Sequence, residues 1–130
     1  MSLVTGSEPP RRPSSGVKLT YDDFVLFPDD GKRHELIDGE HYVTPSPNMK
    51  HQAVCGNLHG LIWHYLRQHP VGKVYVAPLD VVFSHFDVVE PDLLYVSEAR
   101  RDVMTAKNIQ GAPDLAVEVG SQARDGATKS

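Results

Sequence analysis

The stretch VVEPDLLYV, residues 88–96, sets the main constraint on how this chain folds. Most of its residues are β-branched, aliphatic or aromatic, which is the composition of a buried strand. Glu90 and Asp92 nevertheless lie inside it, on either side of Pro91, which has no backbone N–H to donate to a sheet. Burying an ionised carboxylate is costly unless it is paired or bound to a cation. The stretch therefore predicts a strand start or a bulge at Pro91 and a specific partner for Asp92.

A second acid lies in a similar setting. Glu118 falls within DLAVEVGS, residues 114–121, which is predicted to be a further buried strand. If the two strands are neighbours, Asp92 and Glu118 repel each other, which raises one pKa or recruits a cation. Carboxylate oxygens suit Mg²⁺ or Mn²⁺, and such an ion lowers the pKa of a bound water. The alternative is that each acid pairs with an arginine or lysine, or ends its strand in solvent.

The remaining patterns predict a mixed α/β domain with one main sheet. The first elements in chain order are a helix capped by Thr20 and Asp23 and a hairpin that turns at Asp38–Gly39. A long helix over residues 49–69, capped by Asn48, follows. Two strands over residues 73–84 and 87–96 then form a second hairpin, and a polar connection with a short helix comes after them.

Composition narrows the class of protein. The chain has 130 residues and a net charge of −4, which fits one soluble domain and argues mildly against tight non-specific binding to nucleic acid. No membrane span or signal peptide is visible, so a cytoplasmic location is expected. Cys55 is the single cysteine, which excludes an intrachain disulfide and a cysteine zinc cage. Residues 1–18 predict a disordered arm, followed by one domain over residues 19–130.

Five motifs, in order along the chain, resemble the Uma-two family of putative restriction endonucleases, within the restriction-endonuclease-like PD-(D/E)XK superfamily. The resemblance covers roughly residues 18–129 and rests on these stretches: HELIDGE (34–40), TPSPNMKHQAVCGNL (44–58), APLDVVFS (77–84), VVEPDLLYV (88–96) and GAPDLAVEV (111–119).

The resemblance implies a restriction-endonuclease-like core, a mixed α/β sheet with helices around it. On this match Asp92 and Glu118 bind the divalent metal, and Glu35 matches a further acid of the site. The alternative for Glu35 is a surface charge on the hairpin. His51 matches a histidine at the start of the long helix, which could contact phosphate or metal, or simply cap the helix. Asp80 could line the same cleft, although exposure at a strand edge fits it better.

The sequence departs from the family pattern at its end. The superfamily's lysine belongs two residues after Glu118, where this chain has Gly120. The family resemblance implies a later lysine in an Asp-x-x-x-Lys arrangement, which Asp125 and Lys129 match. Family members usually continue beyond this lysine, whereas this sequence stops at Ser130. The domain is therefore expected to be short at its C-terminus, with an exposed sheet edge that favours a homodimer.

Two functions follow as expectations. The first is a divalent-metal-dependent nuclease that uses Mg²⁺ or Mn²⁺ to hydrolyse phosphodiester bonds in DNA. The alternative is a weak or inactive remnant that serves as a binding or assembly module. A metal hydrolase acting on a small molecule is a third reading. It has less support because the seven histidines form no HExxH motif.

Overall fold

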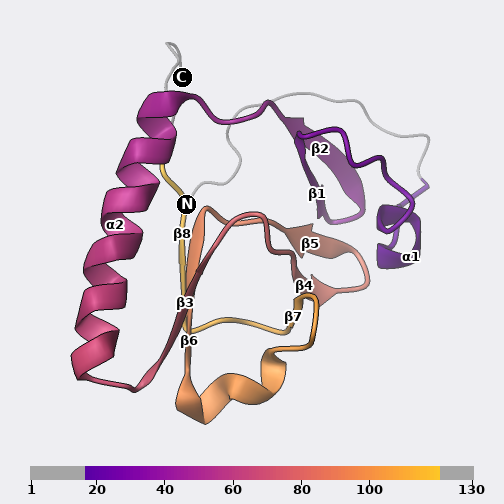
Figure 1. Cartoon of the computed structure of the whole chain (residues 1–130). Coiled ribbons are helices and arrows are strands. Elements are labelled where there is room, and N and C mark those ends of the chain that lie inside the picture. The colour runs from indigo at the N-terminus through magenta and orange to yellow at the C-terminus, as the bar shows by residue number, and fades with distance from the viewer. Residues whose placement is uncertain (1–16, 121–130) are drawn as a thin grey trace.

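The structure is a computed structural model that describes residues 17–120 (Figure 1). Most of the predicted N-terminal arm, residues 1–16, lies outside the described residues, as do Asp125 and Lys129. The elements are α1 (Tyr21–Phe24), β1 (Arg33–Ile37), β2 (Glu40–Thr44), α2 (Met49–Gln68), β3 (Gly72–Val76), β4 (Val81–Ser84), β5 (Asp87–Val89), β6 (Leu93–Ser97), the 3₁₀ helix η2 (Glu98–Val103), β7 (Ile109–Gln110) and β8 (Leu115–Val117).

The predicted mixed α/β class is confirmed, but the strands form two sheets instead of one main sheet. The larger sheet has the order β2-β1-β5-β4-β7 and is mixed, because β4 and β7 run parallel while the other neighbours are antiparallel. The smaller sheet, β3-β6-β8, is antiparallel throughout. Figure 1 shows α2 running alongside this smaller sheet, where it contacts β3.

Two prolines explain why there are two sheets. The predicted strands over residues 73–84 and 87–96 are each broken, at Pro78 and at Pro91, into β3 with β4 and β5 with β6. Neither proline can donate a hydrogen bond to a neighbouring strand. The first halves pair as far as Val76 opposite Leu93, and the second halves resume at Val81 opposite Val89. The long hairpin therefore bends at the prolines and contributes one half to each sheet.

The apolar core follows the same division. One buried cluster is formed by residues of β4, β6 and β7, namely Val81, Leu94, Val96 and Ile109. A second cluster lies beneath α1 and contains Leu36, Val82 and Val88. Because Val81 and Val82 point to opposite faces of β4, this one strand contributes to both clusters. The bend between the sheets is thus fixed from both sides by packed side chains.

The predicted hairpin turn and the two predicted helix caps are confirmed. Asp38 and Gly39 both have positive φ, 52° and 77°, as the tight two-residue hairpin turn requires. The Asn48 side chain accepts a hydrogen bond from the backbone N–H of His51 (2.8 Å), which caps α2. The backbone N–H of Thr20 donates to the Asp23 carboxylate (2.8 Å), which caps α1. Each predicted boundary therefore has the side-chain contact that its sequence signal implied.

One strand differs from its prediction. The stretch that contains Glu118 does form β8, but this strand is not buried, since Leu115 is 48% exposed. The reason is its position at the edge of the smaller sheet, where β6 is its one partner among the strands of residues 17–120. Among the helices described between residues 17 and 120, none combines the length and apolar character that a bilayer span needs.

Gly72 offers a test of the close packing in the smaller sheet. A Cβ atom at this position would overlap the carbonyl oxygen of Val96 and would lie 2.7 Å from the hydroxyl oxygen of Tyr95. We predict that Gly72→Ala lowers the free energy of unfolding by about 2 kcal/mol, as overpacking does. The measurement is urea unfolding followed by circular dichroism.

Gly60→Ala is the matched control, since a Cβ atom there would meet nothing within 4 Å. Gly60 lies inside α2, so alanine should raise the free energy of unfolding by about 0.5–1 kcal/mol. Equal stability of the two variants would contradict the close approach of β3 and β6.

Candidate active site

Carboxylates from three segments converge on one guanidinium where the two sheets part. Arg33, the first residue of β1, contacts the Asp92 carboxylate through Nη2. Its Nη1 lies 3.3 Å from Glu118 Oε1, and its Nε lies 3.6 Å from Glu90 Oε1. The Arg33 side chain is only 16% exposed, and its pairs with Asp92 and Glu90 are well shielded from water, whereas the Glu118 side chain is 38% exposed. The structure thus brings the two predicted metal ligands, Asp92 and Glu118, onto the two terminal nitrogens of one arginine.

Asp92 is the most tightly held acid of the group. The residue is 3% exposed and lies at the bend immediately before β6. One oxygen contacts Arg33, while the other accepts the backbone N–H of Val119 (2.7 Å) and lies 3.2 Å from His51 Nε2. Burial would raise the pKa of Asp92, but the Val119 N–H and the Arg33 guanidinium outweigh it and hold that pKa below its ordinary value. Asp92 is therefore ionised in the folded protein at neutral pH.

Glu90 and Glu118 have the opposite character. Burial raises the pKa of each to about 7, because the nearby Arg33 compensates only part of that cost. Neighbouring acids add to the shift, with Asp80 acting on Glu90 and Asp92 acting on Glu118. Near neutral pH the cluster therefore binds protons that exposed glutamates would release. Among the described residues, Arg33 is the one arginine that pairs with these acids.

Glu35 and Asp80 complete the acidic cluster. Glu35 is half-buried on β1 and its Oε2 accepts the backbone N–H of Glu90 (2.7 Å), so it is not a free surface charge on the hairpin. Burial raises the pKa of Glu35. Asp80 lies just before β4 and is also half-buried, which corrects the expectation of an exposed strand edge, and burial raises its pKa as well. The bend places Asp80 close enough to affect the ionisation of both Glu35 and Glu90.

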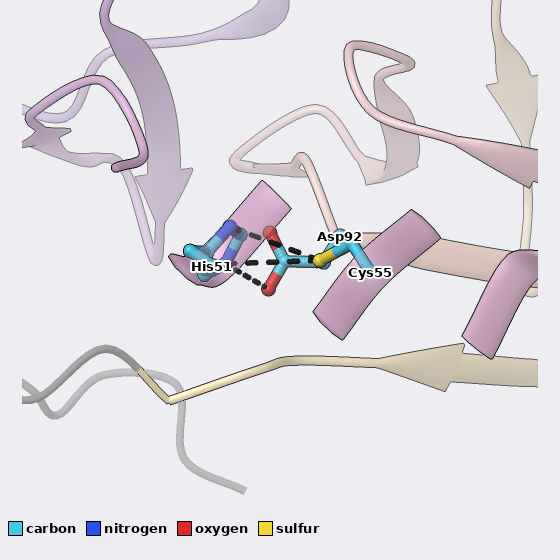
Figure 2. A group of neighbouring side chains, drawn as sticks. All are labelled: His51, Cys55 and Asp92. Atoms are coloured by element: carbon cyan, nitrogen blue, oxygen red, sulfur yellow. Dashed lines mark hydrogen bonds and ion pairs between the residues drawn. The ribbon is translucent and has the colours of Figure 1, made fainter. Parts of the chain in front are cut away.

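The N-terminal part of α2 forms the opposite wall of the site. His51 lies in the first turn of α2, within 3.2 Å of Asp92, and Cys55 follows one helical turn later. The Cys55 sulfur is 3.7 Å from His51 Nδ1, and Figure 2 shows the three side chains facing one another. A cavity of about 250 Å³ opens beside them, lined among others by Arg33 and Gln52. A small ligand or water can therefore reach Asp92 from the α2 side.

Sequence reasoning overlooked Arg33 and left Glu90 unassigned. Arg33 directly precedes the HELIDGE motif, and as residues i and i+2 of one strand Arg33 and Glu35 share a face. That spacing is the only signal that could have placed the arginine beside the acids. The alternative in which Asp92 and Glu118 pair with an arginine is realised, since both contact Arg33. Lys129 lies outside the described residues.

Comparisons with known proteins bear on this geometry. The sequence model of the Uma2 family, described as putative restriction endonuclease, matches residues 21–129. The chain belongs to this family. The resemblance to the Uma-two family noted from the motifs is therefore confirmed. No curated protein matches the chain.

A solved structure supports the fold of this Uma2 member. It is the crystal structure of a putative nuclease belonging to DUF820 from Anabaena variabilis, which is 22% identical and superimposes with a TM-score of 0.66. The alignment covers 82% of this chain and 62% of that one, so the Uma2 member spans less than two thirds of the neighbour's length. At this identity the likeness establishes a shared fold, which agrees with the predicted restriction-endonuclease-like core.

The raised pKa values predict how stability depends on pH. A glutamate whose pKa is higher in the folded than in the unfolded state binds more protons when folded, so folding is favoured at low pH. Between about pH 4.5 and pH 7, Glu90 and Glu118 should therefore make the free energy of unfolding fall as pH rises. We predict that Glu118→Gln reduces this slope, measured by urea unfolding at a series of pH values.

Glu98→Gln serves as the control, because the Glu98 side chain is 54% exposed and its one ion-pair partner within the described part of the chain is Arg101, three residues away. Its slope should equal that of the unmodified protein. If the free energy of unfolding rises steadily from pH 5 to pH 7 in the unmodified protein and in both variants, the pKa values of these glutamates are not raised in the folded state.

Proposed function

We propose that this Uma2 protein is a divalent-metal-dependent nuclease that hydrolyses phosphodiester bonds in DNA. The observation that carries the proposal is the convergence of three carboxylates on the Arg33 guanidinium at the bend between the sheets, with Glu35 and Asp80 close enough to influence them. Such a concentration of half-buried acids is unfavourable for folding alone, and sites of this kind are characteristic of function. The family description and the nuclease-like fold support the reaction class.

The donor set fits a hard divalent cation. Carboxylate oxygens are the ligands that Mg²⁺ and Mn²⁺ prefer, and Asp92 with Glu118 would hold the ion while Glu35 adds charge nearby. Burial, and to a smaller extent the neighbouring acids, raise the pKa of Glu90 and Glu118 to about 7, so a cation could replace the protons that they hold near neutral pH. A bound ion would lower the pKa of a coordinated water and neutralise charge on the phosphate.

Arg33 would have a second role in this reaction. It lies between Asp92 and Glu118, so a cation shared by these two acids requires the guanidinium to withdraw. An arginine released beside the site is well suited to a phosphate, because its planar N–H groups match two phosphate oxygens. Arg33 would then supply the positive charge that Gly120 cannot. Lys129 is proposed for the same task, as the family pattern implies.

His51 is proposed as a positioning residue and not as the base of the reaction. Its Nε2 faces the ionised Asp92 carboxylate at 3.2 Å, and its backbone N–H is fixed by Asn48. The imidazole thereby holds one oxygen of Asp92 in a defined orientation. Together with the Val119 N–H, it leaves the other oxygen of Asp92 directed toward Arg33 and the acidic cluster.

A second candidate function is binding without cleavage. The observation that favours it is that Arg33 already neutralises Asp92 and part of the charge on Glu118. If the arginine cannot be displaced, the acids form a structural ion-pair network and the fold serves as a binding or assembly module. The exposed edge strand β8 is the feature through which we propose that two copies could pair.

Cleavage of DNA in the presence of Mg²⁺ or Mn²⁺ tests the nuclease proposal. We predict that the unmodified protein cleaves plasmid DNA, and that Asp92→Asn and Glu118→Gln each slow cleavage by at least about 100-fold, the upper range seen when a metal site loses a supporting group. Because both replacements keep side-chain shape, the loss would report charge and ligation. The readout is the rate of conversion from supercoiled to nicked or linear DNA.

Glu98→Gln again provides the control, since it removes an acid that lies outside the site. It should cleave at the rate of the unmodified protein. Full activity in Asp92→Asn would refute the proposed role of Asp92. If the unmodified protein cleaves no DNA yet still binds Mg²⁺, the second candidate function is the better account.

A further inference from the structure

His51, Cys55 and Asp92 form a group of potential metal ligands distinct from the all-carboxylate set. One ligand atom from each side chain lies within 4.8 Å of the others. His51 and Cys55 are four residues apart on α2, so both project from the same face of the helix, and Asp92 approaches them from the bend before β6 (Figure 2). The group therefore draws on two separate elements whose relative position is fixed by the fold.

The distances within this group suit zinc. His51 Nε2 lies 3.2 Å from Asp92 Oδ2 and 3.9 Å from Cys55 Sγ. With the usual zinc bond lengths to nitrogen, oxygen and sulfur, two ligands of a tetrahedral ion lie roughly 3.3–3.7 Å apart. The two distances from His51 are therefore close to that geometry, and the Asp92 and Cys55 ligand atoms, within 4.8 Å of each other, would move closer together around the ion. A thiolate and an imidazole also favour zinc over the harder Mg²⁺ ion.

We propose that His51, Cys55 and Asp92 bind a zinc ion, with water from the adjoining cavity as the fourth ligand. The cavity of about 250 Å³ is large enough to hold that water. Asp92 Oδ2 already accepts the Val119 N–H, but a carboxylate oxygen has a second lone pair for the ion. Arg33 contacts the other oxygen, Oδ1, and can stay in place.

The same three residues could instead suggest a cysteine nucleophile with a histidine base. Such a nucleophile needs a thiolate that forms easily. Burial raises the pKa of the Cys55 thiol, and the charge of Asp92 raises it further, so the free thiolate is disfavoured. A zinc ion would place a positive charge next to the sulfur and stabilise the thiolate, so its binding would release the thiol proton of Cys55. The arrangement is therefore better suited to a metal than to covalent catalysis.

Cobalt substitution tests the site directly. Co²⁺ commonly replaces zinc, and a cobalt–thiolate bond produces an intense charge-transfer absorption band. Because Cys55 is the single cysteine of the chain, any such band in the tag-free protein identifies this residue as a ligand. We predict that metal-free protein develops the band on addition of Co²⁺ and loses it when Zn²⁺ is added. Absence of the band would overturn the proposal.

Calorimetry with Zn²⁺ provides the second test. Cys55→Ser and His51→Gln should each weaken zinc binding by at least tenfold, while His64→Gln should leave it unchanged. His64 is the matched control because it lies on α2 outside the proposed site, where its side chain has a hydrogen bond with Gln68 (3.4 Å). Equal zinc affinity in the unmodified protein and in both site variants would place the ion elsewhere and refute the site.

One consequence depends on the proposed nuclease function. Asp92 is a ligand in both sites, so the positive charge of zinc on Oδ2 should weaken the binding of Mg²⁺ through Oδ1. Calorimetry should show Mg²⁺ binding to the zinc-free protein and at least tenfold weaker binding to the zinc-loaded protein. Unchanged Mg²⁺ affinity would show that the two ions do not influence each other through Asp92. If the zinc-free protein binds no Mg²⁺, the nuclease proposal fails, whereas the cobalt and zinc measurements still decide the zinc site.

Discussion

Two prolines that face each other across a hairpin constrain the whole fold. Pro78 and Pro91 cannot donate backbone hydrogen bonds, so the hairpin built from β3, β4, β5 and β6 cannot continue as one ladder. It bends, and each half pairs within its own sheet. The bend leaves a region where backbone groups lack strand partners and side-chain carboxylates can take their place. Glu35 accepts the N–H of Glu90 there, and Asp92 accepts that of Val119.

Arg33 holds the acids at this bend together but compensates only part of their charge. Arg33 offers one positive charge to Asp92, Glu118 and Glu90, and Glu35 and Asp80 lie near enough to add to their repulsion. A buried ion pair seldom stabilises a fold more than apolar packing would. The arrangement therefore costs stability, which is typical of sites kept for function. It also explains why the acids differ, with Asp92 ionised and Glu118 holding a proton near neutral pH.

Asp92 also interacts with a side chain of α2. The same carboxylate that contacts Arg33 also faces His51, with Cys55 one helical turn beyond. The protein thus presents a hard, oxygen-rich side and a softer side with nitrogen and sulfur around a single acid. Which cation the protein holds would then depend on which one is available, and this choice would decide whether the oxygen-rich side is free for phosphodiester chemistry.

Much of this could be predicted from sequence because the signals were local. The turn at Asp38–Gly39, the cap of α2 and the anomaly of acids in an apolar strand each depend on a few neighbouring residues. The role of Arg33 depends on Asp92 and Glu118, which lie 59 and 85 positions further along the chain, and no local pattern specifies such distant partners.

The division into two sheets was missed for a related reason. Pro91 was recognised as a break, but Pro78 matters only because the register sets it near Pro91. One cysteine cannot form a cysteine cage, and although His51 and Cys55 share a face of α2 by their spacing, Asp92 joins them only when α2 packs against the smaller sheet.

The central claim is that the acids around Arg33 carry more negative charge than the arginine can balance and can exchange protons for a divalent cation. The most direct measurement is an NMR titration of the side-chain carboxyl carbons of Glu90 and Glu118, with and without Mg²⁺. Without the ion, each pKa should lie near 7, and with Mg²⁺ the pKa of Glu118 should fall markedly. Ordinary pKa values near 4.5 that Mg²⁺ leaves unchanged would contradict this account.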